Sequence, residues 1–127
     1  MVRVYALLLR GAIHAVSPSA KDRARAQRDA DHLVALDAES ARGAAELIRA
    51  LGCAHDGRGE EAIARLGASA ASFDGAGMAL HAAAVRRRRG ALIGGDEGRA
   101  VTSAADAVLS AASIADPARW SATIVPG

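Results

Sequence analysis

Aromatic residues are almost missing from this sequence of 127 residues, since one Trp, one Tyr and one Phe make up 2% of it. Because β-sandwich and β-barrel cores lean on aromatic and β-branched side chains, this scarcity argues against both architectures. Hydrophobic residues still make up 51% of the chain and charged residues 24%, which is typical of a globular protein. Alanine, the strongest helix former, is the commonest of the apolar residues. We therefore predict a single all-α domain.

Cysteine and long apolar runs are also scarce. Cys53 is the only cysteine, which excludes an internal disulfide and fits a reducing compartment. The apolar run at residues 4–9 is shorter than the core of a secretory signal peptide, and it ends at Arg10. No stretch approaches the roughly 18 apolar residues of a transmembrane helix. We therefore expect a cytoplasmic protein with no part in the membrane.

Neither sign of charge is in strong excess. Sixteen basic residues face fourteen acidic ones, which gives a net charge of +2, and Lys21 is the sole lysine. A nucleic-acid-binding protein should carry a basic stripe, often with aromatic platforms, whereas here the charges are interspersed. Nucleic acid is therefore not expected as the main partner. We interpret the carboxylates of the second predicted helix as surface charges that aid solubility: Asp22, Asp29, Asp31 and Asp37.

Apolar residues recur at helical spacing, in stripes separated by turn signals. The stripes predict six helices, and their residues are Tyr5, Leu8, Leu9, Ala12, Ile13, Val16; Ala26, Ala30, Leu33, Val34; Ala44, Leu47, Ile48, Leu51; Ala62, Ile63, Leu66, Ala70, Phe73; residues 78–93; and Val101, Ala104, Ala105, Val108, Leu109, Ala112. Glycine-rich stretches at 56–59, 74–77 and 94–96 predict the turns.

Two polar sites predict where helices begin. Ser19, three residues before Asp22, indicates the start of the second helix. Asp116 followed by Pro117 is the pattern of a helix N-cap, and it predicts a seventh, short helix. We expect Trp120 and Ile124 to be its buried anchors.

The helix–turn–helix pattern repeats. Residues 57–63 align with residues 95–101 at an offset of 38, and the same offset leads back to the start of the second helix. Such a period is typical of solenoids, in which stacked units build a shared core. We therefore predict an α-solenoid of three antiparallel helix pairs, in a right-handed superhelix. Its units are residues 3–37, 40–74 and 78–114, with a cap at 116–125. Ala62 and Ala100 should then occupy equivalent buried positions.

These units resemble tetratricopeptide (TPR) repeats, through their small residues at fixed places and the acidic-Ala-apolar sequence that follows the glycine turn at residues 61–63. The period is longer than the usual TPR period of about 34 residues. Four segments, residues 74–84, 86–90, 94–100 and 116–119, together resemble the TPR-like C-terminal region of large bacterial serine/threonine protein kinases of the myxobacterial type. This resemblance implies a scaffold or sensor role, with the kinase motifs upstream.

Catalytic and metal-binding motifs are not apparent in the sequence. It has no phosphate-binding glycine loop followed by Lys-Ser or Lys-Thr, and no kinase catalytic loop. Residues 94–98 lack a lysine and follow a helix, so they read as a turn. Cys53, His55 and Asp56 fall short of the four paired ligands of a zinc site, because the other histidines are scattered at 14, 32 and 81. We expect no enzyme activity, metal or cofactor.

The arginine run at residues 86–89 is the strongest charge feature. Four consecutive helical residues spread over about 300°, so they cannot form one flat patch, and a solvated face is the simplest interpretation. The sequence predicts a protein–protein interaction module, for which His55, His81, Arg86 and Arg89 are candidate partner-binding residues. The alternative is a small helical module that binds nucleic acid or phosphate through Arg86 to Arg89.

Overall fold

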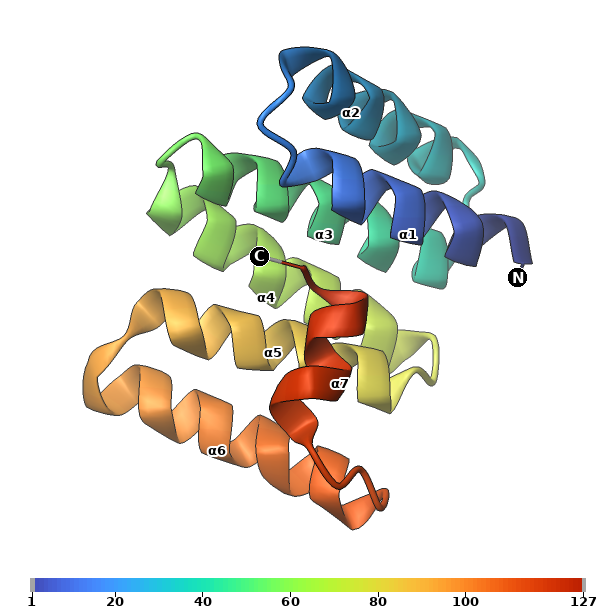
Figure 1. Ribbon diagram of the computed structural model, residues 1–127. Helices are drawn as coiled ribbons and strands as arrows, with labels where there is room; N and C mark the ends of the chain where they lie inside the picture. Colours follow the sequence, from blue (N-terminus) through green and yellow to red (C-terminus); the bar gives the residue numbers. More distant parts are fainter. Residues whose placement is uncertain (1, 127) are drawn as a thin grey trace.

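The computed structural model describes the backbone of residues 2–126 and the side chains of residues 6–126, so the predicted role of Tyr5 lies outside the described side chains. Within this range all regular structure is helical, which confirms the prediction of an all-α fold (Figure 1). In chain order the helices are α1 (Val2–Ala15), α2 (Ala20–Ala35), α3 (Glu39–His55), α4 (Gly59–Gly75), α5 (Ala79–Ile93), α6 (Gly95–Ala111) and α7 (Pro117–Ile124).

Local polar groups define where several helices begin and end. The Ser19 side chain accepts a hydrogen bond from the backbone N–H of Asp22, and Asp116 accepts one from the N–H of Arg119 ahead of α7. These side chains satisfy N–H groups that the first turn of a helix leaves without partners. Gly57 and Gly77 end α3 and α4 with φ values of 77° and 74°, which glycine adopts without strain.

Short turns make consecutive helices pack against each other. α1 packs on α2, α3 on α4 and α5 on α6, while α2–α3 and α4–α5 contacts join one pair to the next. α7 lies across α5 and also touches α6 (Figure 1). Neighbouring helices are therefore packed along the whole chain, in the order of the sequence.

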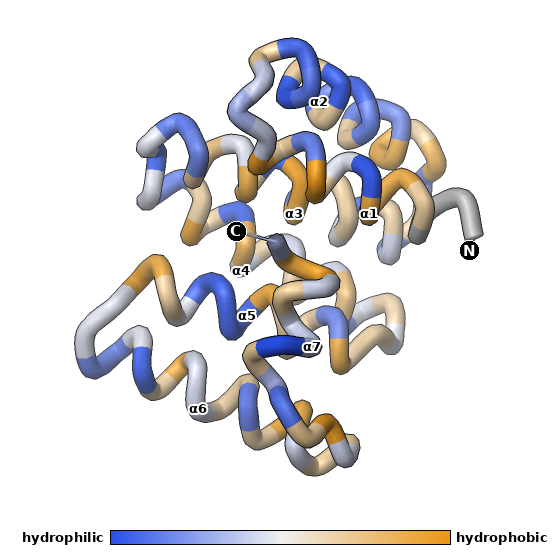
Figure 2. The backbone as a smooth tube through the Cα atoms, in the orientation of Figure 1, coloured by the Kyte–Doolittle hydropathy of each residue, from blue (hydrophilic) through white to orange (hydrophobic). Residues whose placement is uncertain are grey.

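The core is built mainly from alanine and leucine. One cluster runs from α1 to α5 and takes in Ile124 and Val125 from the C-terminal segment. Phe73 is its largest fully buried side chain, and a Cβ at Gly43 would lie only 3.1 Å from the Phe73 ring. Small residues therefore let the helices approach closely. In Figure 2, α2 is the most polar tube, whereas apolar segments recur along α1 and α3.

The expected equivalence of Ala62 and Ala100 is wrong, because Ala62 is fully buried and Ala100 is exposed. Among the buried small residues of the second helices, Ala26, Ala62 and Gly98 are each 36 residues from the next. Two turns of unequal length explain the error. Residues 56–58 separate α3 from α4, but Gly94 alone separates α5 from α6. Aligning the turns by sequence therefore shifts α6 by two residues.

Five predicted stripe residues also differ from expectation, since Ala104 and Ala112 are exposed, as are three larger side chains. Ile13, Val34 and Val108 are exposed, with exposed fractions of 61%, 45% and 45%. Trp120, expected to be buried, is half-buried and packs against the cluster that contains Leu109, while Ile124 is buried. The predicted anchors of α7 therefore do pack, with Ile124 the better buried.

Asp29 is not a surface charge, which corrects the interpretation made from the sequence. It is 6% exposed, and its two oxygens accept hydrogen bonds from Nε and Nη2 of Arg10 on α1. This hydrogen bond raises the pKa of Arg10 above its ordinary value, and the Asp29 charge adds to the effect. The other three carboxylates also have partners, since Asp31 pairs with Arg49, Asp37 with Arg42, and Asp22 accepts from Ser17.

Candidate functional site

The four residues predicted to bind a partner do not come together. His55 is exposed at the end of α3. His81 is half-buried between two rings, with centroids 5.6 Å from Phe73 and 6.4 Å from Trp120. Burial lowers the pKa of His81, because it disfavours the charged imidazolium. Arg86 and Arg89 line a common cavity.

The arginine run makes contacts with the protein itself, which corrects the interpretation as a solvated face. All four side chains are half-buried. Arg86 Nη2 lies 2.6 Å from Asp74 Oδ2 on α4, and Arg87 Nε lies 2.8 Å from Asp106 Oδ1 on α6. Arg89 Nε donates to the carbonyl oxygen of Ile63 at 3.2 Å. The run therefore spreads over different neighbours, as its helical geometry requires, and forms no single basic patch.

The cavity that Arg86 and Arg89 line is an apolar groove. Its walls come from α4 and α6, and α5 lies between them as its floor (Figure 1). We name it the α4–α6 groove; its volume is about 480 Å³ and its lining is Gly67, Asp74, Ala79, Ala83, Arg86, Arg89, Val101, Ala104, Ala105 and Val108. Small apolar side chains make up most of this lining, with the charged groups contributed by α4 and α5.

The sequence pattern missed this groove for an identifiable reason. Val101, Ala104, Ala105 and Val108 recur at helical spacing, and that spacing is also what a core stripe shows. In the structure Ala105 is buried, but Val108 is 45% exposed. No helix covers this side of α6 in the described part of the chain. An apolar stripe alone does not tell a covered face from an open one.

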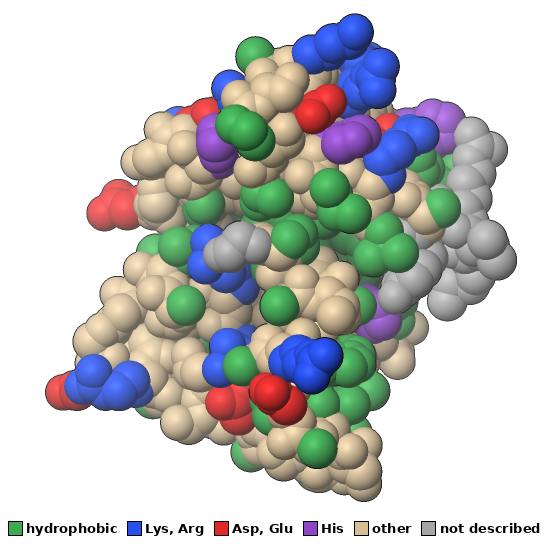
Figure 3. Space-filling view, viewed as in Figure 1, with side chains coloured by type: hydrophobic (Ala, Val, Ile, Leu, Met, Phe, Trp, Pro, Cys, Tyr) green, Lys and Arg blue, Asp and Glu red, His purple; other side chains and the backbone are tan. Residues whose placement is uncertain are grey.

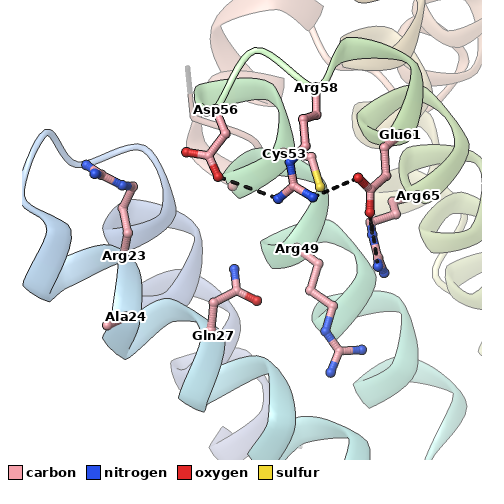
Figure 4. A pocket seen from close by; sticks show the side chains of 10 residues that line it. Arg23, Ala24, Gln27, Arg49, Cys53, Asp56, Arg58, Glu61 and Arg65 are labelled. Atoms are coloured by element: carbon pink, nitrogen blue, oxygen red, sulfur yellow. Dashed lines mark hydrogen bonds and ion pairs between the residues drawn. The ribbon is translucent and has the colours of Figure 1, made fainter.

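A second groove has the same construction one helix pair earlier. Its walls come from α2 and α4, with α3 as the floor (Figure 4). We name it the α2–α4 groove; its volume is about 320 Å³ and its lining is Arg23, Ala24, Gln27, Arg49, Gly52, Cys53, Asp56, Arg58, Glu61 and Arg65. The lining is much more polar than that of the α4–α6 groove.

Most of the arginines in the α2–α4 groove form ion pairs. Arg58 bridges Asp56 and Glu61, and Glu61 in turn reaches Arg65, as Figure 4 shows. Partial burial is the largest single effect on the pKa of Arg65 and lowers it. The hydrogen bond and the charge of Glu46, with smaller contributions from Cys53 and Glu61, together raise the pKa of Arg65 above its ordinary value. Arg49 pairs with Asp31. The cations of this groove are therefore largely neutralised.

The described residues offer no cluster with metal-binding chemistry. Among them, no three His, Cys, Asp or Glu side chains are placed to hold a metal ion together. The free thiol of Cys53 is buried, whereas His55 and Asp56 are exposed. On the face shown in Figure 3, basic side chains are scattered among acidic and apolar ones. Within residues 2–126, no helix is both long and apolar enough to cross a lipid bilayer.

Comparison with protein-family models, with curated proteins and with solved structures finds no match to this chain. The grooves themselves are therefore the basis for a functional proposal.

Proposed function

We propose that this chain is a non-catalytic protein-interaction module of helical-repeat, TPR-like type. The observation that carries the proposal is the recurrence of one groove design along the chain. In both grooves, second helices of successive pairs form the walls and the first helix between them forms the floor. Repeat proteins present extended concave surfaces of this kind to their partners.

The spacing of buried small residues supports the repeat. Ala26, Ala62 and Gly98 recur every 36 residues in the second helices, where a helix must approach its pair closely. That spacing is close to the period of about 34 residues that is typical of TPR units. The resemblance to the C-terminal region of bacterial serine/threonine kinases stays a prediction. The reading frame upstream of Met1 tests it, because a kinase domain should be encoded there.

Affinity capture with groove-filling variants tests the proposed function. Ala24 in the α2–α4 groove and Ala104 in the α4–α6 groove are both exposed, so Ala24→Trp and Ala104→Trp should fill a groove without disturbing the core. Ala107→Trp, exposed on α6 outside the groove lining, is the matched control. Each protein would be immobilised and exposed to nuclease-treated lysate of the source organism.

We expect at least one protein to be retained by the wild type and by Ala107→Trp, and lost with one groove-filling variant. Equal retention on all four proteins, or no specific retention, would contradict the proposal. A salt series addresses the nucleic-acid alternative, because binding to phosphates falls steeply with salt as counterion release is suppressed. That alternative draws little support from Arg86 and Arg87, which already pair with Asp74 and Asp106.

A further inference from the structure

We infer that the α4–α6 groove binds a segment of a partner protein that carries apolar side chains and one carboxylate, and that this carboxylate pairs with Arg89. The inference rests on the proposed function and names the chemistry of the partner. Three observations carry it: the apolar lining of the groove, the exposure of Val108, and the bonding of Arg89.

The lining favours apolar side chains over a polar ligand. Ala79, Ala83 and Ala104 are small, so a partner can approach the backbones of α5 and α6 closely. Val108 leaves 45% of its surface in water on this wall, and covering it would remove apolar area from solvent. Burial of such area is the main driving force of protein association.

Arg89 supplies the charge complementarity. Its Nε donates to the Ile63 carbonyl oxygen, and among the described residues Arg89 takes part in no ion pair. Arg86, the other cation of this groove, already has Asp74 at 2.6 Å. The half-buried Arg89 guanidinium therefore keeps its terminal amino groups for an incoming acceptor. A carboxylate suits this arrangement, because it accepts two parallel hydrogen bonds from a guanidinium.

Gly67 leaves room for Arg89 in this position. A Cβ at Gly67 would lie 3.4 Å from Arg89 Nε, so the missing side chain lets the guanidinium rest against α4. The α2–α4 groove offers no equivalent cation on its floor, because Arg49 there is paired with Asp31. Selection for an acidic residue by the groove floor should therefore belong to the α4–α6 groove.

A displayed library of random 12-residue peptides is a direct probe. The library would be selected on the full chain, and the enriched peptides would be synthesised with each acidic residue present or changed to its amide. We expect enriched peptides to combine apolar residues with one Asp or Glu. The acid-to-amide change should weaken binding about tenfold, the loss typical of one charge-assisted hydrogen-bonded pair.

Variants of the protein locate the site. Arg89→Gln should bind the enriched acidic peptides about tenfold more weakly and should no longer distinguish acid from amide. Arg89→Lys should retain part of that preference, since the charge remains. Arg28→Gln removes an exposed arginine of α2 and should change neither property. Ala104→Trp should abolish binding, whereas Ala107→Trp should not, and circular dichroism would confirm that every variant is folded.

The outcomes separate this inference from the proposed function. Enriched peptides that bind Arg89→Gln and Ala104→Trp as tightly as the wild type would overturn the groove assignment alone. Enriched peptides without an acidic residue would also overturn the groove assignment. So would a dimer, seen by analytical ultracentrifugation, that Ala104→Trp disrupts, because a second copy of the chain would then occupy the groove. A library that yields no binder at all would contradict the proposed function as well.

Discussion

The ion pair between Arg10 and Asp29 links α1 to α2 through the one buried carboxylate among the described side chains. Taking a carboxylate out of water is costly unless a cation and hydrogen bonds replace the solvent. Arg10 does both, although its own side chain is 59% exposed. The pair therefore offsets the cost of burying Asp29, and solvent screens its contribution.

Replacing Arg10 with Met should lower the free energy of unfolding, because the Asp29 carboxylate would stay buried without its partner. In an Asp29→Asn background the same replacement should lower the free energy of unfolding much less, since a neutral amide needs no counterion. Urea unfolding of the four proteins in a double-mutant cycle measures the difference. Equal losses in both backgrounds would show that Asp29 does not depend on Arg10.

His81 should make stability depend on pH. Burial lowers its pKa in the folded protein, while the unfolded chain titrates near the ordinary histidine value of about 6.5. Below that value the unfolded state binds a proton that the folded state resists, so stability falls as the pH drops toward the folded pKa. The melting temperature of the wild type should therefore decrease more between pH 7.5 and 5.5 than that of His81→Gln. Parallel curves for the two proteins would rule out this contribution of His81.

At the scale of helices, glycine residues let α5 and α6 pack closely against each other. Gly94 alone connects the two helices, and the crossing places Gly90 against Gly98. A Cβ at Gly98 would lie 2.3 Å from the Gly90 carbonyl oxygen, and one at Gly90 would lie 2.7 Å from the Gly98 carbonyl oxygen. These neighbours are backbone atoms, which cannot turn aside as a side chain can.

Gly98→Ala should therefore destabilise the protein by about 1–3 kcal/mol, because α5 and α6 must separate to admit one methyl group. Gly59→Ala is the matched control, since a Cβ there meets no heavy atom within 4 Å. It should leave stability within about 0.5 kcal/mol or raise it slightly. Chemical denaturation measures the free energy of unfolding of both variants. If they behave alike, the helices do not approach at Gly98 as closely as described.

Helix ends were predictable from the sequence because their causes are local. Ser19, Asp116 and the glycine turns act within a few residues, and the structure confirms the helix starts they predict. Burial was less predictable because it depends on which helix packs where. Ala100 is exposed although the repeat predicts its burial, because the one-residue turn before α6 changes the register of that helix. Asp29 is buried because Arg10, 19 residues away in the sequence, pairs with it.

The candidate site shows the same division. Arg86 and Arg89 were recognised from their charge, and they do line one cavity. Their neighbours Val101 and Val108 were assigned to the core, because apolar spacing on α6 is identical for a covered and an uncovered face. For His55 and His81 the prediction rests on residue type alone, and both lie outside the two grooves. The groove exists because α4 and α6 lie apart on either side of α5. This arrangement depends on three helices, so no single segment of the sequence predicts it.

The molecule as a whole has two unequal ends. At the N-terminal end α1 and α2 pack mainly on each other and on α3, and Ile13 stays 61% exposed. At the other end α7 packs on α5 and α6 and sends Ile124 and Val125 into the main core. A stack of helices leaves an apolar face at each end unless a further segment covers it. At the C-terminal end α7 covers part of α5 and touches α6.

The covering role of α7 can be tested through Trp120, the only tryptophan. Trp120→Ala should cost about 2 kcal/mol, below the 3–5 kcal/mol of a fully buried tryptophan, because the ring is half-buried between the two core clusters. Truncation after Ala115 should cost more, since it also removes Ile124 and Val125. The control Ala122→Ser, on the exposed side of α7, should change the free energy of unfolding by no more than about 0.5 kcal/mol. Thermal and urea unfolding measure these losses, and the wild-type emission should be blue-shifted and partly protected from a soluble quencher. A fully solvated emission, together with a truncated chain as stable as the intact one, would show that α7 does not hold the C-terminal end of the stack.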